Sequence, residues 1–435
     1  MSKGTAKSGT RSRRKPAKQL KGQVRRVDGG ENATTVQLTL PIKELLAGVS
    51  GAIESLAGEA GLLIMKSLID EEVEQLAGQR CKHDQGDKAV RWGAEESYVL
   101  LGGKKVPVRR PRVRERRGSE LPIERFRLFQ RPALMEGSVA KEVICGVSMR
   151  DYERAVDGLC DGYGIQRSSV SRHWKAVSAA RLAEFLERPL RELDLVAVLI
   201  DGIEFHEQLL VVAMGIDSQG KKEILGLWQG ATENSEVCRG LLDDLVRRGV
   251  DSQKKLLFVL DGSKALQKAV RQVFGKDSLI QRCQVHKARN ILEHLPPSRH
   301  RSIRMRLRAA WGMKSYEEAK SELVRLVRHL KDLNPSAARS LEEGLEETLT
   351  LHQLDVPDAL RRSLKTTNPI ESCFSATRKY CRNVKRWRKG DMAMRWAGTM
   401  LLEAQKRFRR LKGHRAMPKL LLTLGRSIES QKALA

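Results

Sequence analysis

The fold of this chain is decided by residues 195–230, which read LVAVLIDGIEFHEQLLVVAMGIDSQGKKEILGLWQG. Three apolar runs lie at 196–203, 208–216 and 223–229, and short polar links separate them. The second link, Asp217-Ser218-Gln219-Gly220, has the composition of a tight turn. Because links this short can join only antiparallel neighbours, we predict a meander of three strands.

The sequence after the meander alternates between helical and strand patterns. We predict a helix over 235–248, a strand over 256–260, a helix over 263–274 and a strand over 279–283. Strands joined by a helical crossover are parallel, so the first strand of the meander should lie beside the fourth strand and run parallel to it. The order β-β-β-α-β-α-β is that of a ribonuclease H-like core, whose first part we expect over 191–295.

Two aspartates stand at the predicted ends of these neighbouring strands. Asp201 and Asp261 each precede a glycine. A single aspartate in such a place is often only a turn residue or a helix cap. Two on adjacent parallel strands should meet at one edge of the sheet, where they repel each other unless a cation or a proton lies between them. Mg²⁺ fits this place, because it takes oxygen ligands and keeps several waters.

A third carboxylate, Glu371, lies in the final core segment, 363–412, near the start of a helix predicted to begin with Asn368 as N-cap and Pro369 in first position. A glutamate there can also complete a capping box, which needs no metal. Five cations are expected on one face of this helix and four apolar residues on the other. The cations are Arg378, Arg382, Lys385, Arg386 and Lys389, and the apolar residues are Ala376, Tyr380, Val384 and Trp387. This cationic face suits a phosphate backbone and favours Glu371 as a metal ligand.

The chain is strongly basic. Its 435 residues hold 81 Lys plus Arg against 53 Asp plus Glu, a formal net charge of +28. Such a surplus predicts a polyanionic partner, and nucleic acid is the commonest one. A membrane surface is the rival partner, but no apolar run approaches the roughly 18 to 20 residues of a spanning helix. Seven scattered cysteines without a CxxC pair indicate free thiols in a reducing cytoplasm.

The N-terminal part is divided by its charge pattern. Residues 1–33 are expected to form a disordered basic arm, since positions 1–26 carry ten basic side chains and no acidic one. A helical region is predicted over 34–95 and a basic β-ribbon over 96–120, with Gly102-Gly103 as its turn. Its arginines exceed what protection of a sheet edge requires, so we predict phosphate contacts from Arg109, Arg110 and Arg112.

Residues 121–190 are predicted to be helical and to contain a helix-turn-helix, with Ser168 as the N-cap of the second helix. A recognition helix presents its first turn to the edges of the bases. The candidate DNA-reading residues are therefore Arg167, Ser169 and Arg172. Many helical pairs share this pattern without touching DNA, so a packed helical pair is the alternative.

Five short motifs occur in order along the chain. They are Asp201-Gly202-Ile203, Gly230-Ala231-Thr232-Glu233-Asn234, Asp261-Gly262, Cys283-Gln284-Val285-His286 and Thr367-Asn368-Pro369-Ile370-Glu371-Ser372. Together they resemble the bacterial insertion-sequence transposases of the Mutator type, and the resemblance covers most of the chain, including 91–93 and 106–114. It implies DDE-type transposition, in which Asp201, Asp261 and Glu371 form the metal-binding triad. It also implies that Cys283 and His286 are the family's Cys-x-x-His element beside that triad.

The same resemblance explains why Asp261 and Glu371 are 110 residues apart (371 − 261), which is more than the core fold needs. The family carries a helical insertion at this point, and residues 296–362 have a helical pattern. Trp311 lies in this insertion. A core tryptophan is one interpretation, and stacking on an unpaired base is the functional alternative. Residues 413–435 are expected to form a C-terminal tail.

Cys283 and His286 are half of the four ligands that a structural zinc site needs, and no second pair stands at a recognisable spacing. We therefore expect no zinc. His286 should orient a phosphate or a water near the triad, and Cys283 should pack as a buried thiol.

The family resemblance also implies a mechanism and partners. Two Mg²⁺ ions, for which Mn²⁺ can substitute, would assist in-line attack at phosphorus. Water frees a 3′-OH at the transposon end, and this 3′-OH then attacks target DNA. The implied partners are the terminal inverted repeats and target DNA, bound by a homodimer or larger assembly without a membrane. The implied location is the bacterial cytoplasm, at the nucleoid.

Two alternatives stay open at this point. A nuclease or junction resolvase on the same fold would cut DNA without strand transfer. A DNA-binding regulator, or a domesticated transposase, would bind DNA without cutting it, although an intact triad disfavours that reading.

Overall fold

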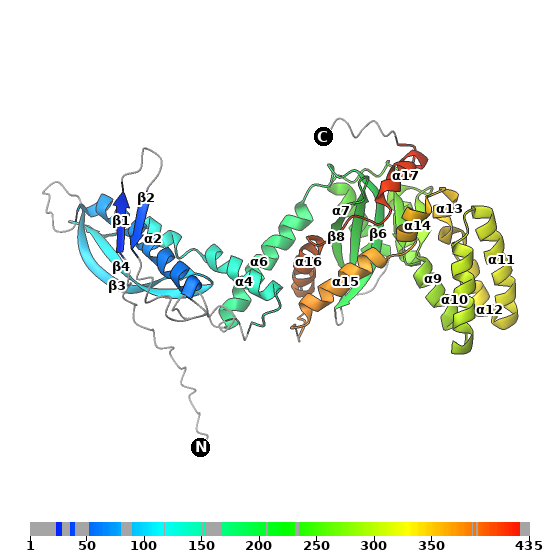
Figure 1. The fold of residues 1–435 in the computed structure, drawn as a ribbon, viewed down its shortest axis with the longest axis horizontal. Coiled ribbons are helices and arrows are strands. Elements are labelled where there is room, and N and C mark those ends of the chain that lie inside the picture. Colours follow the sequence, from blue (N-terminus) through cyan, green and yellow to red (C-terminus); the bar gives the residue numbers. More distant parts are fainter. Residues whose placement is uncertain are drawn as a thin grey trace, which may run out of the picture. The chain divides into compact units, whose positions relative to one another are not determined.

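The computed structural model describes residues 23–27, 35–39, 52–79, 89–116, 118–149, 152, 167–205, 208–230, 235–384, 386–388 and 390–426. The chain divides into two compact units, Met1–Val177 and Ser178–Ala435. Both units combine helices with sheets (Figure 1), which confirms a multidomain α/β protein. No helix in the described ranges is long and apolar enough to cross a bilayer.

The first unit contains a short hairpin of β1 (Gln23–Val27) and β2 (Thr35–Thr39), which pair antiparallel. This hairpin corrects two expectations. Strand β1 lies within the range 1–33 predicted to be disordered, and β2 lies within the range 34–95 predicted to be helical. The basic charge of the first segment favoured a prediction of disorder. In the structure, β1 and β2 pair with each other, and this pairing satisfies the backbone hydrogen bonds of both segments. Residues 1–22 of the arm lie outside the described residues.

The predicted ribbon is confirmed. Helix α2 (Ala52–Ala77) packs with a sheet of β3 (Ala89–Leu101), β4 (Lys104–Glu115) and β5 (Glu120–Leu121). The turn is Gly102-Gly103, and both glycines have the positive φ that a two-residue hairpin loop requires. Strand β3 starts before the predicted ribbon boundary of 96. A register shift between Arg91 and Ala94 interrupts the alternation that marks a strand in the sequence.

Carboxylates neutralise part of the ribbon's charge. The Nε of Arg112 donates to Glu120 at 2.9 Å, and Arg110 also pairs with Glu120. The Nε of Arg110 lies 3.0 Å from a carboxylate oxygen of Glu95, whereas Arg109 is largely exposed and its Nε lies 4.0 Å from Glu96. The sheet brings these acids to the arginines from neighbouring strands, so the ribbon offers fewer unpaired cations to phosphates than its sequence indicates.

Helices α3 (Glu124–Leu128), α4 (Pro132–Ile144) and α6 (Arg167–Glu187) follow the ribbon. Helix α6 begins at Arg167, one residue before the expected cap at Ser168. Arg172 is exposed and Ser169 is half-buried. Residues 153–166, where the turn of the helix-turn-helix is expected, lie outside the described residues, so this motif stays a prediction.

The second unit is built on a five-stranded sheet with the order β10-β9-β6-β7-β8. The strands are β6 (Leu195–Phe205), β7 (Gln208–Asp217), β8 (Lys222–Gly230), β9 (Leu257–Leu260) and β10 (Leu279–Arg282). Strands β6, β7 and β8 are antiparallel neighbours, whereas β9 pairs parallel with β6 and with β10. The predicted meander and the predicted parallel neighbours are both confirmed.

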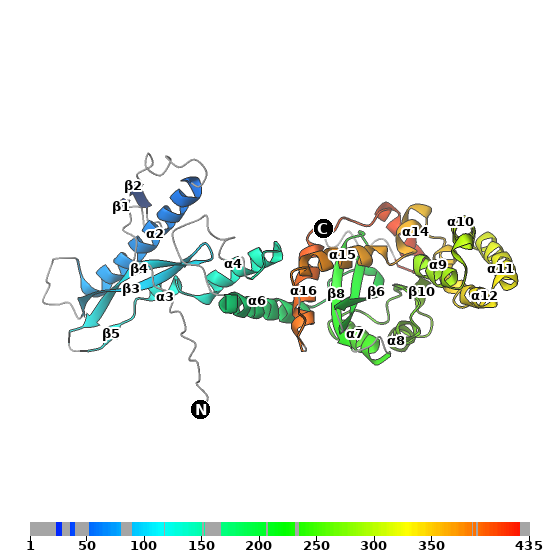
Figure 2. The same ribbon diagram turned by 90° about the horizontal axis from the view of Figure 1, so that it is seen from below.

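The helices of this unit are α7 (Ser235–Arg247), α8 (Lys264–Phe274), α9 (Gln284–Glu293), α10 (Pro297–Trp311), α11 (Tyr316–Leu333), α12 (Pro335–Glu342), α13 (Thr350–Gln353), α14 (Asp358–Leu364), α15 (Asn368–Cys381), α16 (Met392–Gln405) and α17 (Met417–Thr423). Helices α7 and α8 cover one face of the sheet, and α15 and α16 lie along the other (Figure 2). Ile200 and Leu260 belong to the core under α7 and α8. Because side chains alternate along a strand, Asp201 belongs to the opposite face, which α15 covers.

The predicted helical insertion is present as α10 to α14. It has its own apolar core, in which Leu307, Leu323 and Leu326 are fully buried. Trp311 is only 4% exposed, and its Nε1 donates to the hydroxyl of Thr348 at 3.2 Å. This buried position contradicts the proposed stacking of Trp311 on an unpaired base and makes it a core residue.

The long cationic helix face predicted after Glu371 is wrong, because α15 ends at Cys381. Arg378 and Arg382 lie exposed at its end, whereas Arg386 lies in the segment that follows. Lys385 and Lys389 lie outside the described residues. The five cations therefore do not share one helical face.

Aromatic packing holds the segment that follows α15. The ring of Trp387 lies 5.0 Å from the ring of Phe205 at the end of β6, and 6.3 Å from that of Trp396 in α16. These contacts hold the chain against the sheet and favour a turn over a longer helix. Part of the expected C-terminal tail is also ordered structure, because α17 buries Met417 and Leu420.

Candidate active site

Strand pairing brings Asp201 and Asp261 to the same edge of the sheet. The parallel ladder between β6 and β9 ends at the pair Ile200 and Leu260, so the two aspartates are the next residues on adjacent strands. The expectation that both stand at strand ends is corrected for Asp201, because β6 continues to Phe205 in its pairing with β7. Asp201 is therefore held more rigidly than a loop residue.

Backbone amides fix the orientation of both carboxylates. The amide of Gly202 donates to Asp201 at 2.8 Å, and the amide of Ser263 donates to Asp261 at 2.9 Å. Gly262 has a φ of 112°, and a Cβ at this position would collide with the guanidinium of Arg282. The glycine after Asp261 therefore permits both the turn and the close approach of Arg282.

Glu371 reaches this edge from the first turn of α15. The N-cap is Thr367, one residue earlier than predicted, so Pro369 is in the second position of the helix. The capping-box alternative is contradicted by the hydrogen bonds. The carboxylate of Glu371 accepts from the hydroxyl of Thr367 at 2.7 Å, while the amide of Thr367 faces the sulfur of Cys283 at 3.5 Å. Glu371 is thus free of the capping role that its position in the sequence allows.

The surrounding ionisable groups shift the pKa of Asp201. Burial, followed by the charge of Asp261, raises the pKa of Asp201 to about 7. Glu371 adds to this rise, and His286 opposes it. Asp201 is only 8% exposed, so water screens little of this repulsion. Carboxylates held together in this way repel one another, and either a proton or a divalent cation relieves this repulsion.

Cys283 and His286 form a network with Thr367 beside the carboxylates. Cys283 is fully buried, as predicted, and its Sγ lies 3.5 Å from the hydroxyl oxygen of Thr367, whose proton is donated to Glu371. Burial alone would raise the pKa of this thiol, but hydrogen bonds from His286 and Thr367 lower it. The hydrogen bond with Cys283 is also the main cause that raises the pKa of His286 to about 9. The Nε2 of His286 lies 3.8 Å from Glu371.

Two sets of candidate ligand residues can be distinguished at this edge. Among the described residues, Cys283, His286 and Glu371 offer ligand atoms within 4.8 Å of one another. Structural zinc needs a fourth ligand, and no other metal-binding side chain of the described part joins this group within that distance. The all-oxygen set of Asp201, Asp261 and Glu371 has the donors that Mg²⁺ prefers.

Thr367 is the site residue that the sequence did not single out. Its hydroxyl contacts Glu371, Cys283 and His286, the last at 3.4 Å from Nδ1, and its side chain is fully buried. The sequence feature that could have identified Thr367 is its position directly before Asn-Pro at a predicted helix start, because threonine is a favoured N-cap residue.

Comparison with known proteins assigns the family. The model of the Mutator family of transposases matches residues 41–410. The chain is 29% identical to the transposase for insertion sequence element IS6120 of Mycolicibacterium smegmatis, over 54% of this chain and 72% of the relative. It is 27% identical to the transposase for ISRM5 of Rhizobium meliloti, over 71% of this chain and 76% of the relative. It is 25% identical to the transposase for IS256 in transposon Tn4001 of Staphylococcus aureus, over 85% of this chain and 95% of the relative. The chain belongs to the Mutator family of transposases, whose members are enzymes of DNA transposition.

Proposed function

We propose that this transposase uses Asp201, Asp261 and Glu371 as a DDE triad on a ribonuclease H-like core. The observation that carries this proposal is the convergence of three carboxylates, two from adjacent parallel strands and one from α15, at one edge of the sheet. The strand order supports the choice of core, because an antiparallel meander continues into parallel crossovers.

Each residue has a distinct task in this proposal. The three carboxylates would hold Mg²⁺ or Mn²⁺, and a pair of such ions stabilises charge on the attacking and leaving oxygens of a phosphoryl transfer. Thr367 and Cys283 orient Glu371 and His286. His286, with its raised pKa, offers a positive charge to the phosphate that lies beside Glu371.

DNA reaches this site through contacts elsewhere in the chain. We assign phosphate contacts to Arg109, whose side chain is largely exposed, and base contacts to Arg167, Ser169 and Arg172 of α6. The substrates in this proposal are the terminal inverted repeats of an insertion sequence and a target duplex. Joining two ends requires at least two active sites, so we propose a homodimer or larger assembly on DNA.

Thr367 provides a test of the orienting network. Thr367→Val should lower cleavage by roughly 10- to 100-fold, because an outer partner that orients a metal ligand is lost. Thr367→Ser should keep most of the activity, since it retains the hydroxyl. The matched control is Thr377→Val in α15, where a fully buried threonine hydrogen-bonds to the backbone carbonyl and the thiol of Cys373 and not to a carboxylate. Equal losses from both valine variants would mean that Thr367 serves packing alone.

The proposed function is tested by mapping the DNA products strand by strand. Purified protein is incubated with Mg²⁺, a duplex that carries the element's end and its flank, and a plasmid target. We expect a nick that leaves a 3′-OH at the element's end, followed by covalent joining of that 3′ end to the plasmid. Cutting without joined product would indicate a nuclease or resolvase, and binding without either product would indicate a regulator.

A further inference from the structure

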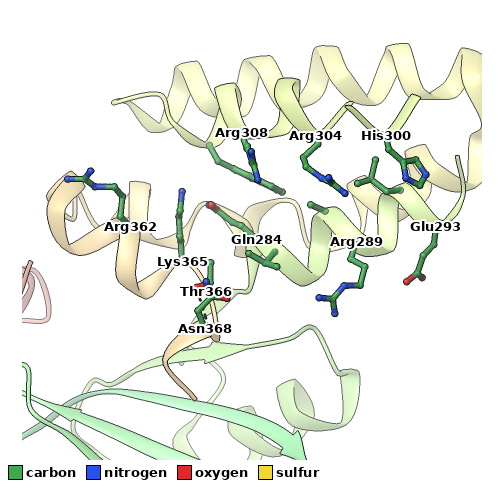
Figure 3. A pocket seen from close by; sticks show the side chains of 14 residues that line it. Gln284, Arg289, Glu293, His300, Arg304, Arg308, Arg362, Lys365, Thr366 and Asn368 are labelled. Atoms are coloured by element: carbon green, nitrogen blue, oxygen red, sulfur yellow. Dashed lines mark hydrogen bonds between the residues drawn. The ribbon is translucent and has the colours of Figure 1, made fainter. Parts of the chain in front are cut away.

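A cavity of about 560 Å³, here called the α10 hollow, opens beside the candidate active site. Figure 3 shows it between α9, α10 and the segment that joins α14 to α15. Its charged lining consists of Arg289, Arg304, Arg308, Arg362 and Lys365, with Glu293 as the one acidic residue. Arg304 and Arg308 reach down from α10 into the space that Lys365 enters from the other side (Figure 3). The hollow is therefore strongly cationic.

A second cavity of about 800 Å³, here called the α15 hollow, lies against α15 and the segment after α16. Its lining contains no acidic residue. Besides Arg362, its cations are Lys222, Lys379, Arg407, Arg409, Arg410 and Lys412. Arg362, Thr366 and Asn368 line both hollows, so the two cavities meet at the start of α15.

The meeting point lies next to the carboxylates. Thr366 and Asn368 flank Thr367, whose hydroxyl binds Glu371. On the other side, the amide of Gln284 donates to the carbonyl of Lys365 at 2.9 Å, which ties the start of α9 to the same segment. A strand that occupied both hollows would therefore pass beside Glu371.

The cations of the two hollows differ from those of the ribbon. In the ribbon, Arg110 and Arg112 form ion pairs with Glu120. Within the described ranges, Arg304, Arg308 and Arg362 have no carboxylate oxygen within ion-pair distance. The same holds for the six other cations of the α15 hollow. Burial, followed by the charge of Arg361, lowers the pKa of Lys365; Arg308 and Arg362 add to this shift, and Asp358 opposes it. Unpaired cations crowded into a hollow repel one another, and an anion removes that cost.

We propose that the two hollows form one track that binds successive phosphates of a DNA strand as it passes the active site. This inference rests on the proposed function and adds the residues that hold the substrate strand. Arginine binds phosphate through two parallel hydrogen bonds, and four of the seven cations that line the α15 hollow are arginines. Phosphates carry no sequence information, so the track contributes affinity without base preference.

The test compares variants of equal charge change in the full chain. Arg304→Gln with Arg308→Gln removes two cations from the α10 hollow, and Arg409→Gln with Arg410→Gln removes two from the α15 hollow. The matched control is Arg299→Gln with Arg301→Gln, two exposed arginines of α10 outside both hollows. The probe is a 40-base-pair duplex of mixed sequence, and affinity is measured against salt concentration in the presence of EDTA.

Each double variant of a hollow should make the slope of log K, where K is the association constant for DNA, against log salt shallower by about 1.8, since each lost phosphate contact contributes about 0.9. At 0.15 M salt this corresponds to roughly a 30-fold weaker affinity. The control pair should change the slope by much less. Equal changes from the hollow pairs and the control pair, or an unchanged slope in the hollow pairs, would overturn the track.

A second measurement uses the unaltered protein, so that it does not depend on the folding of any variant. Phenylglyoxal modifies accessible arginines, and mass spectrometry identifies which ones the duplex protects. Protection of Arg304, Arg308, Arg409 and Arg410, but not of Arg299 and Arg301, is expected. Modification that is the same with and without DNA would refute the track. Because neither measurement involves metal or cleavage, a failure here leaves the carboxylate triad untouched, and a failure of the triad leaves this result intact.

Discussion

Replacing Glu371 by glutamine should lower strand cleavage by about a thousandfold or more while DNA affinity stays the same. A metal ligand contributes several kcal/mol of transition-state stabilisation, and each 1.4 kcal/mol corresponds to a factor of ten in rate. Glutamine keeps the shape of the side chain and can still accept the hydrogen bond from Thr367. Single-turnover cleavage of a labelled end duplex measures the rate, and a gel-shift titration measures the affinity.

The control for this variant is Glu317→Gln. Glu317 is exposed in the first turn of α11, so it has a similar helical position without the candidate site. Its cleavage rate should equal that of the unaltered protein. Normal cleavage by Glu371→Gln would remove Glu371 from the triad and return it to a structural role at the start of α15.

Asp201→Asn should abolish cleavage and, in the absence of metal, make the protein more stable. The folded protein raises the pKa of Asp201 from 3.8 to about 7, so ionisation of this group disfavours folding. The penalty is absent below pH 3.8, grows as the pH rises to 7 and is complete above pH 7. Removing the charge should therefore raise the free energy of unfolding at pH 8 by up to about 4 kcal/mol.

Thermal unfolding at pH 8, with EDTA or with Mg²⁺, measures both parts of this expectation. The unaltered protein should gain about 2.7 kcal/mol when Mg²⁺ is present at a hundred times its dissociation constant, and Asp201→Asn should lose that gain. Asp243→Asn, on the exposed side of α7, is the control and should change neither quantity much. A lower metal-free stability of Asp201→Asn, together with an undiminished gain from Mg²⁺, would argue against a metal site at Asp201.

The sheet and the pair of aspartates could be predicted because local patterns determine them. Short links between apolar runs force antiparallel pairing, and helical crossovers force parallel pairing. These two rules place β6 beside β9, and with them Asp201 beside Asp261. The predicted first strand, 196–203, falls short of the last two residues of β6, whose pairing with β7 extends to Phe205.

Features that depend on distant partners could not be predicted in this way. Trp387 packs against Phe205, which lies far from it in the sequence, so no local pattern could predict this contact. The contact holds the segment that follows the end of α15. Glu120 neutralises Arg110 and Arg112 only because β5 joins the ribbon. Glu371 does not complete a capping box because Thr367 is the N-cap, which places Glu371 in the fourth helical position, and the amide of Thr367 faces the sulfur of Cys283, 84 residues away. In each case tertiary packing overrides a sound local expectation.

The two hollows could not be predicted for the same reason, because their residues are far apart in the sequence. Arg304 and Arg362 belong to α10 and α14, and the α15 hollow adds Lys222 of β8 and Arg407 beyond α16. Nothing in the spacing of these residues marks them as a group. They form one cationic surface only after the insertion has packed onto the core.

The most direct test of the central claim is to locate the bound divalent ion on the protein itself. Fe²⁺ replaces Mg²⁺ in the full chain, and ascorbate with hydrogen peroxide then generates hydroxyl radicals that cut the backbone next to the ion. We predict cuts near Asp201, Asp261 and Glu371, all suppressed by excess Mg²⁺. Cuts confined to the neighbourhood of Cys283, His286 and Glu371, or cuts that excess Mg²⁺ does not suppress, would contradict the carboxylate triad.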